Sequence, residues 1–229
     1  MLKKIALQAA NVTSKLLPDE IDGLSTFAHK LKSGERTTSI PGSCTVKIFV
    51  LCSGHANAGG INCDGRGIFA FQPDAEITVE AISDITLLEI ECKAEKLKSD
   101  ALPYFTSYED APRYKEDCKS EKTVNRMLLP EGLIPGIAIG SVETYGKDRI
   151  EKHEHPFCDQ LFFSFEENDM DVLIDDDSVH MGGNMILHIP IGSSHGVSVS
   201  DGGCAHYLWI DFVIDERGSE YISSAHKMI

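Results

Sequence analysis

The fold is decided by a stretch in the second half of the chain that reads KHEHPFCDQLFF at residues 152–163. Successive side chains of a β-strand point to opposite faces, so His153 and His155 share a face and Glu154 lies on the other. Gln160 begins an apolar run, and the segment PIGSSH at 190–195 ends in His195. Three imidazole nitrogens and one amide oxygen can therefore converge on one point.

Such a convergence is a candidate site for one divalent transition metal, because neutral imidazoles are good ligands for such ions. Single histidines are usually packed or solvated residues, and His180, His188, His206 and His226 are interpreted in that way. The joint placement of His153, His155 and His195 is what favours a metal.

The rest of the chain predicts mainly antiparallel β-sheet. Short β-prone runs separated by Gly, Pro, Asn and Asp lie at 46–52, 67–71, 77–81 and 86–91, and strands resume from 137 to 213. Residues 1–40 indicate an arm with a helix or an edge strand. Residues 94–127 are charged and indicate a connecting segment with a helical turn.

An internal repeat relates the two β-rich regions. The segment IFAFQP at 68–73 is followed eleven residues after its proline by Asp84, and MILHIP at 185–190 is followed by Asp201 at the same interval. Extending this alignment upstream pairs 49–54 with 162–167. The four ligand positions of the first half are then occupied by Ile40, Gly42, Lys47 and Thr78, which predicts that the N-terminal repeat holds no metal.

These motifs resemble those of the cupin superfamily. Its first motif is a glycine, about five residues, His-x-His, three or four residues, Glu, six residues and Gly, and its second is Pro-x-Gly-x-x-His. Here the first motif reads Gly146, six residues, 153–155, four residues and Gln160, with Glu167 replacing the final glycine. The second motif is complete at 190–195. The resemblance covers residues 140–213 well, and residues 44–92 only as a strand pattern.

The resemblance implies an all-β fold of two cupin-type antiparallel β-barrels, each a double-stranded β-helix or jelly roll. This bicupin would comprise an N-terminal arm with a degenerate, metal-free repeat at 1–95, a connecting segment at 96–130 and a metal-binding barrel at 131–229. The implied metal ligands are His153, His155, Gln160 and His195. The implied cofactor is one divalent transition metal, which can be nickel, manganese, iron, cobalt or zinc because His-rich cupin sites accept all of these. Some cupins, including enzymes acting on unsaturated uronates, are similar in using Gln here, and Asp159 is the alternative ligand because the family's spacing varies by one residue.

Composition excludes several other classes of function. The formal net charge of −15 opposes binding to nucleic acid, which relies on Lys and Arg to neutralise phosphates. No apolar run approaches the roughly 20 residues that cross a bilayer, and the N-terminus lacks the continuous apolar region of a signal peptide. The seven cysteines are scattered singly, which predicts reduced thiols in a cytoplasmic protein.

The site favours an enzyme in which the metal acts as a Lewis acid on a small anionic metabolite, a sugar acid or keto acid, as in isomerases and lyases. A metal-dependent dioxygenase and a non-catalytic cupin that binds a small molecule are the alternatives. Phe162 and Ser164 share the face of Gln160, and Glu143, Tyr145, His188 and His206 are candidates for a base or an orienting group. A homodimer is expected, because cupin sheet edges are often covered by a second subunit.

Overall fold

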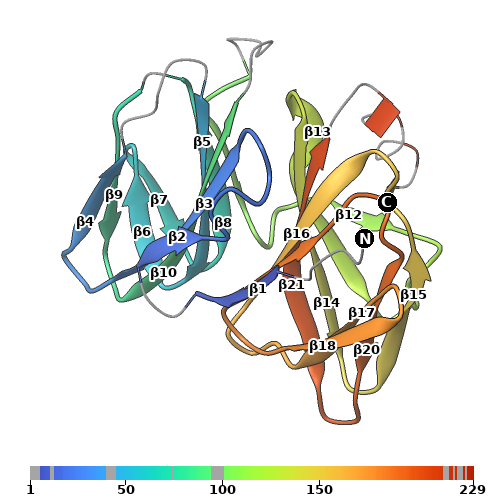
Figure 1. Ribbon diagram of the computed structural model, residues 1–229. Helices are drawn as coiled ribbons and strands as arrows, with labels where there is room; N and C mark the ends of the chain where they lie inside the picture. Colours follow the sequence, from blue (N-terminus) through green and yellow to red (C-terminus); the bar gives the residue numbers. More distant parts are fainter. Residues whose placement is uncertain are drawn as a thin grey trace. The chain divides into compact units, whose positions relative to one another are not determined.

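The computed structural model describes residues 6–10, 13–39, 45–73, 75–93, 101–213, 217, 218, 220, 224 and 226–229. The chain forms two compact units (Figure 1). The N-terminal unit comprises Ala10–Ala111 with Leu133–Pro135, and the C-terminal unit comprises Met1–Ala9, Pro112–Gly132 and Gly136–Ile229. Each unit consists of a larger and a smaller sheet of antiparallel strands, which confirms the predicted all-β fold.

The N-terminal unit has a six-stranded and a four-stranded sheet. The larger sheet runs β11 (Tyr104–Ser107), β8 (Gly67–Phe71), β5 (Thr45–Ser53), β10 (Ile85–Lys93), β3 (Leu24–Leu31) and β2 (Ser14–Leu16). The smaller sheet runs β4 (Arg36–Ser39), β9 (Ile77–Ala81), β6 (His55–Ala58) and β7 (Ile61–Asp64). Apolar residues of both sheets, including Phe49, Phe69 and Val79, form one buried core between them.

The C-terminal unit is built in the same way. Its larger sheet runs β1 (Ala6–Ala9), β19 (Met185–Ile189), β16 (Cys158–Ser164), β21 (Cys204–Val213), β14 (Ile137–Tyr145), β13 (Val124–Ile134), β12 (Arg113–Lys115) and β22 (Lys227–Met228). The smaller sheet runs β15 (Asp148–His153), β20 (His195–Val199), β17 (Met170–Ile174) and β18 (Asp177–Met181). Phe162, Leu187 and Trp209 of the larger sheet pack with Val172 and Val197 of the smaller one.

The predicted segments 1–95, 96–130 and 131–229 do not coincide with these units. Strand β1 pairs with β19 and so extends the C-terminal sheet, whereas β3 lies between β10 and β2 in the N-terminal sheet. The described part of the predicted connecting segment forms β11, which pairs with β8, and β12, which pairs with β13. Which unit a strand belongs to is decided by pairing with strands far away in the sequence. The local sequence pattern carries no information on that pairing.

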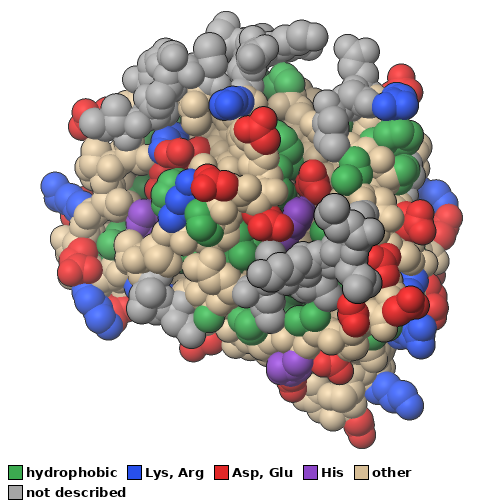
Figure 2. Space-filling model, viewed as in Figure 1, with side chains coloured by type: hydrophobic (Ala, Val, Ile, Leu, Met, Phe, Trp, Pro, Cys, Tyr) green, Lys and Arg blue, Asp and Glu red, His purple; other side chains and the backbone are tan. Residues whose placement is uncertain are grey.

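The surface carries many of the Asp and Glu side chains that outnumber Lys and Arg in the sequence. Asp and Glu side chains are spread over the visible face (Figure 2), in keeping with the net charge of −15. Among the described residues, no helix has both the length and the apolar character needed to span a membrane.

A buried charged cluster lies on the inner face of the N-terminal unit. Lys47 has a side-chain exposure of 2%, and its Nζ donates to Glu89 Oε1 at 2.9 Å and also to Glu91. Glu89 additionally contacts His29 Nε2 at 2.8 Å and accepts a hydrogen bond from Ser39 Oγ at 2.5 Å. This arrangement satisfies the ammonium and the Glu89 carboxylate, which neither could achieve alone in an apolar interior.

Lys47 occupies the position in its unit that Gln160 occupies in the other. Lys47 lies opposite Glu91 in the pairing of β5 with β10, and Gln160 lies opposite Asp211 in the pairing of β16 with β21. The alignment of 49–54 with 162–167 gives the same correspondence. A lysine therefore replaces a predicted metal ligand in the N-terminal unit.

We expect Lys47→Met to lower the free energy of unfolding by about 3–5 kcal/mol, because it leaves the buried Glu89 carboxylate without its ammonium partner. Lys32→Met is the control. The Lys32 side chain is 78% exposed and pairs with Asp84 at the surface, where an ion pair contributes at most about 1 kcal/mol. Urea denaturation of both variants checks this, and equal losses would show that the buried cluster is not stabilising.

The same cluster predicts a pH dependence. Burial would raise the pKa of Glu89, but hydrogen bonds from His29, Ser39 and Lys47 outweigh it and lower the pKa from 4.5 to about 2. A carboxylate with a depressed pKa stabilises the fold above its ordinary pKa and loses that contribution as pH falls from about 4.5 to about 2. In this window the wild type should lose up to about 3 kcal/mol more than Glu89→Gln, measured by denaturation at successive pH values.

Candidate metal centre

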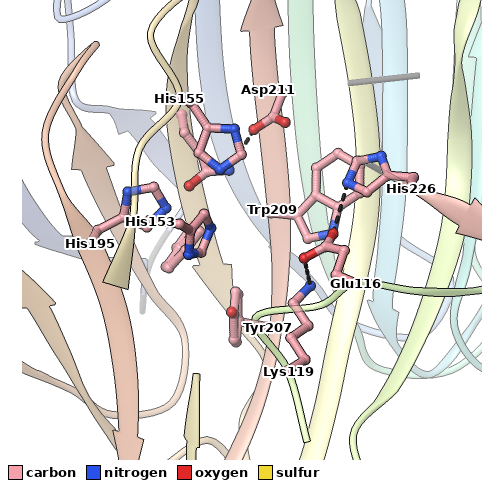
Figure 3. Close-up of a pocket in the computed structure, with 11 residues that line it drawn as sticks. Glu116, Lys119, His153, His155, His195, Tyr207, Trp209, Asp211 and His226 are labelled. Atoms are coloured by element: carbon pink, nitrogen blue, oxygen red, sulfur yellow. Dashed lines mark hydrogen bonds and ion pairs between the residues drawn. The ribbon is translucent and has the colours of Figure 1, made fainter. Parts of the chain in front are cut away.

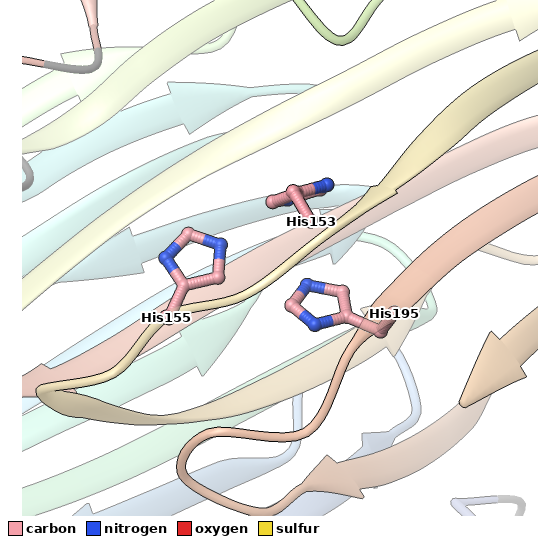
Figure 4. A group of neighbouring side chains, drawn as sticks. All are labelled: His153, His155 and His195. Carbon is pink, nitrogen blue, oxygen red and sulfur yellow. The ribbon is translucent and has the colours of Figure 1, made fainter. Parts of the chain in front are cut away.

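Three histidines of the C-terminal unit lie beside one another (Figure 4). His153 ends β15 and His195 begins β20, and the two residues lie opposite one another in the pairing of these strands. The ring centroid of His153 is 4.6 Å from that of His195 and 5.0 Å from that of His155. One ligand atom from each ring lies within 4.8 Å of the other two. The structure thus brings together the three histidines that the motifs predict.

Backbone carbonyls orient two of these rings. His153 Nδ1 lies 2.9 Å from the carbonyl oxygen of Glu151, and His195 Nδ1 lies 3.2 Å from that of Ser193. Since a carbonyl can only accept, each Nδ1 carries the proton and each Nε2 keeps its lone pair. His195 Nε2 is buried and has no hydrogen-bond partner among the described residues. Metal-ligating histidines are commonly held in this way.

Burial keeps His155 and His195 uncharged. Burial, with a smaller contribution from the nearby His153, lowers the pKa of His155 to about 3. Burial and the neighbouring His153 and His155 also hold the pKa of His195 well below its ordinary value. Neutral imidazole is the form that binds a metal.

Gln160 lies in the same pocket and Asp159 does not. Gln160 Nε2 donates to Asp211 Oδ1 at 2.5 Å, which leaves Gln160 Oε1 buried and without a partner among the described residues. Asp159, on the other face of β16, contacts His188 Nε2 at 3.1 Å and accepts from the backbone N–H of Ile191 at 3.0 Å. Between the two alternative ligands, the geometry favours Gln160. Two orphaned buried atoms, His195 Nε2 and Gln160 Oε1, fit a divalent metal.

A second group of possible ligands shares His155. Ligand atoms of His155, Cys158 and Asp211 lie within 4.8 Å of one another. Burial raises the pKa of the Cys158 thiol to about 12, so a metal bound there would have to displace the thiol proton. The set of three histidines is the better match to a metal, because two of them are already uncharged.

The pocket beside the histidines has a charged wall that the sequence did not reveal (Figure 3). Glu116 Oε2 lies 2.8 Å from Lys119 Nζ, and Glu116 Oε1 lies 2.8 Å from His226 Nε2. Burial would raise the pKa of Glu116, but Lys119 and His226 outweigh it and hold the pKa well below its ordinary value. Glu116 is therefore ionised although only 12% of its side chain is exposed.

Aromatic side chains complete the pocket. Phe162, Tyr207 and Trp209 line it, and Trp209 Nε1 donates to Tyr114 Oη at 2.7 Å. His226 stacks on Trp209 with a ring separation of 4.8 Å. The cavity leaves about 20 Å³ for the centre of a water molecule, which is room for an ion or about one water.

Four expected pocket residues lie elsewhere. His206 contacts Glu167 at 2.6 Å, His188 contacts Asp159, Glu143 pairs with Arg126, and Tyr145 is exposed. Tyr207, Trp209 and Asp211 take the inner face of β21, so His206 falls on the outer face. Phe162 lines the pocket as expected, whereas Ser164 hydrogen-bonds the backbone at Gly182 and Met185.

No family model matches the sequence, and no curated protein matches it either. Solved structures do match. An IolB-like protein from Salmonella typhimurium LT2 superimposes with a TM-score of 0.72 at 14% identity, covering 95% of this chain and 99% of that one. A cupin 2 conserved barrel domain protein from Leptotrichia buccalis matches with a TM-score of 0.56 at 13% identity, covering 91% of this chain and 89% of that one.

Oxalate decarboxylase from Bacillus subtilis, an enzyme with Mn(II) centres, matches with a TM-score of 0.67 at 10% identity, covering 92% of this chain and 78% of that one. This chain has the cupin fold. The fold predicted from the His-x-His and Pro-x-Gly-x-x-His motifs is confirmed, and at these identities the likeness concerns the fold alone.

The contact between Gln160 and Asp211 yields a prediction. Gln160→Glu replaces a hydrogen-bond donor to a buried carboxylate with a second negative charge, so the variant should be about 1–3 kcal/mol less stable in EDTA. Gln160→Met, which removes the donor without adding charge, is the control and should lose less. Urea denaturation measures both, and an equal loss would show that charge repulsion plays no part.

Proposed function

We propose that this cupin is a metal-dependent enzyme that acts on a small anionic metabolite. The observation that carries the proposal is the convergence of three histidines on one point, with a charged acid–base cluster in the same pocket. His153, His155 and His195 would hold the ion together with Gln160. A bound divalent metal supplies Lewis-acid chemistry, polarising an oxygen of the ligand.

The charges of the pocket support an anionic ligand. Burial raises the pKa of Asp211 to about 6, so this group is largely ionised at neutral pH, as is Glu116. Counting the histidines as neutral and Lys119 as protonated, the pocket carries one net negative charge, which a divalent ion converts to one net positive charge. Buried uncompensated charge is costly, so an anion would complete the site.

The charged wall favours catalysis over simple binding. A dry apolar cavity would suit a module that only binds a small molecule, but this pocket places Glu116, hydrogen-bonded to His226, in the same cavity as the histidines. Such a pair can hold or move a proton at the Glu116 carboxylate or His226 Nε2.

The first test is metal content. His155→Ala should bind a divalent metal far more weakly, by more than the roughly 10- to 100-fold seen when an outer partner of a ligand is removed. His180→Ala is the control, because His180 is exposed and contacts only surface carboxylates. Elemental analysis after dialysis against Mn²⁺ or Zn²⁺ gives the stoichiometry. Full occupancy in His155→Ala would refute the ligand assignment.

The compartment and the assembly remain predictions. Six cysteines are described, and all six are free thiols, which supports the proposal of a reducing, cytoplasmic location. A homodimer is proposed from the exposed strand edges expected of the fold, and sedimentation of the purified chain tests it.

A further inference from the structure

Asp211 is a buried carboxylate of which only one oxygen has a hydrogen-bond partner among the described residues. The residue is 1% exposed and lines the same pocket as the three histidines. Its Oδ1 accepts a hydrogen bond from Gln160 Nε2 at 2.5 Å, whereas Oδ2 is buried and accepts none. A buried carboxylate is costly unless it is compensated. Lys119, the ammonium of this pocket, is paired with Glu116, so a cation from outside the chain would compensate Asp211 best.

Asp211 also decides which end of the Gln160 amide faces the histidines. An ionised carboxylate can only accept, so the amide turns its N–H group to Asp211 and keeps Oε1 for the rest of the pocket. An amide oxygen can bind a metal, whereas an amide N–H group cannot. A ligand atom of Asp211 lies within 4.8 Å of one of His155, and the two side chains are neighbours in Figure 3. The charge of Asp211 is therefore next to the candidate metal ligands.

The N-terminal unit shows what the equivalent carboxylate contacts. Glu91 lies opposite Lys47 in the pairing of β10 with β5, just as Asp211 lies opposite Gln160 in the pairing of β21 with β16. The Lys47 ammonium donates to Glu91. The carboxylate at this place in the fold thus faces a cation in the unit that has one in its own chain. The same place in the C-terminal unit holds a carboxylate and a neutral amide.

We propose that Asp211 is the charged positioning residue of the metal centre. It holds Gln160 with Oε1 towards the histidines, and it supplies the negative charge that imidazole and amide ligands lack. The cavity has room for an ion or about one water, which is sufficient for this role. The inference rests on the proposed function for the metal itself, and it adds the residue that balances the charge of the ion from behind Gln160.

The experiment exchanges the charge between the two residues while keeping their shapes. Asp211→Asn should weaken Mn²⁺ binding roughly 10- to 100-fold, as the loss of an outer partner of a metal ligand does. The double variant Gln160→Glu/Asp211→Asn moves the carboxylate to the ligand position and reverses the hydrogen bond, so it should recover most of the lost affinity. Titration calorimetry of the full chain with Mn²⁺ measures both variants.

Asp171→Asn is the matched control. The Asp171 side chain is 53% exposed and contacts His180 at the surface, outside the pocket, so its loss should leave Mn²⁺ affinity unchanged. Urea denaturation in EDTA separates positioning from a structural role. Asp211→Asn removes a buried charge and keeps an acceptor for Gln160, so without metal it should be at least as stable as the wild type. A loss of stability in EDTA that accompanies the loss of affinity, with no recovery in the double variant, would show a structural role.

The double variant alone decides the matter if Asp211→Asn does not fold. Its Mn²⁺ affinity should then be close to that of the wild type, and a loss of roughly 10-fold or more would overturn the inference.

The outcomes distinguish this inference from the proposed function. A wild-type chain that takes up no Mn²⁺ would refute the proposed metal site and the inference with it. Mn²⁺ binding that His155→Ala abolishes and Asp211→Asn leaves unchanged would overturn the inference alone. A double variant that binds Mn²⁺ no better than Asp211→Asn would also overturn it.

Discussion

The pairing of β15 with β20 is the constraint on which the site depends. This register sets His153 opposite His195, and His155 follows two residues later on the same side. Side chains alternate along a strand, so a slip by one residue would turn His153 away from the other two rings. The backbone carbonyls of Glu151 and Ser193 then fix the rings with Nε2 available. Strand register and two carbonyl contacts together give the geometry that a metal needs.

The larger sheet supplies the rest of the pocket by the same alternation. Pairing of β16 with β21 sets Gln160 opposite Asp211 and Phe162 opposite Trp209, all on the inner face. Strand β22 pairs with β12, and His226, which directly precedes β22, contacts Glu116, which directly follows β12. The pocket therefore has the three histidines and Gln160 on one wall and the paired charges of Glu116, Lys119 and His226 on another. Aromatic rings separate the charges from bulk water, which strengthens their interactions.

The sequence predicted the wall of the pocket that carries the histidines and Gln160. It did not predict the wall that carries the paired charges. His153, His155, Gln160 and His195 fall within two local motifs whose spacing is set by strand geometry, so they could be predicted together. Glu116, Lys119 and His226 come from segments about a hundred residues apart that no short pattern connects. His206 was expected near the site because β21 is apolar on both faces, and its sequence shows no alternation from which the inner face could be chosen. The domain limits failed to coincide for a related reason: β1 and β11 join their sheets through long-range pairing.

Because of Lys47, the two units differ in the charge that the chain itself supplies at one equivalent position. The Lys47 ammonium stands where Gln160 stands in the other unit, and it is covalently part of the chain. A chelator therefore cannot remove this ammonium, and a shortage of metal cannot leave its position empty. The N-terminal unit thus carries a permanent cation at this position, whereas the corresponding position of the C-terminal unit carries the neutral Gln160. A metal proposed to bind beside Gln160 would have to come from the surroundings of the protein.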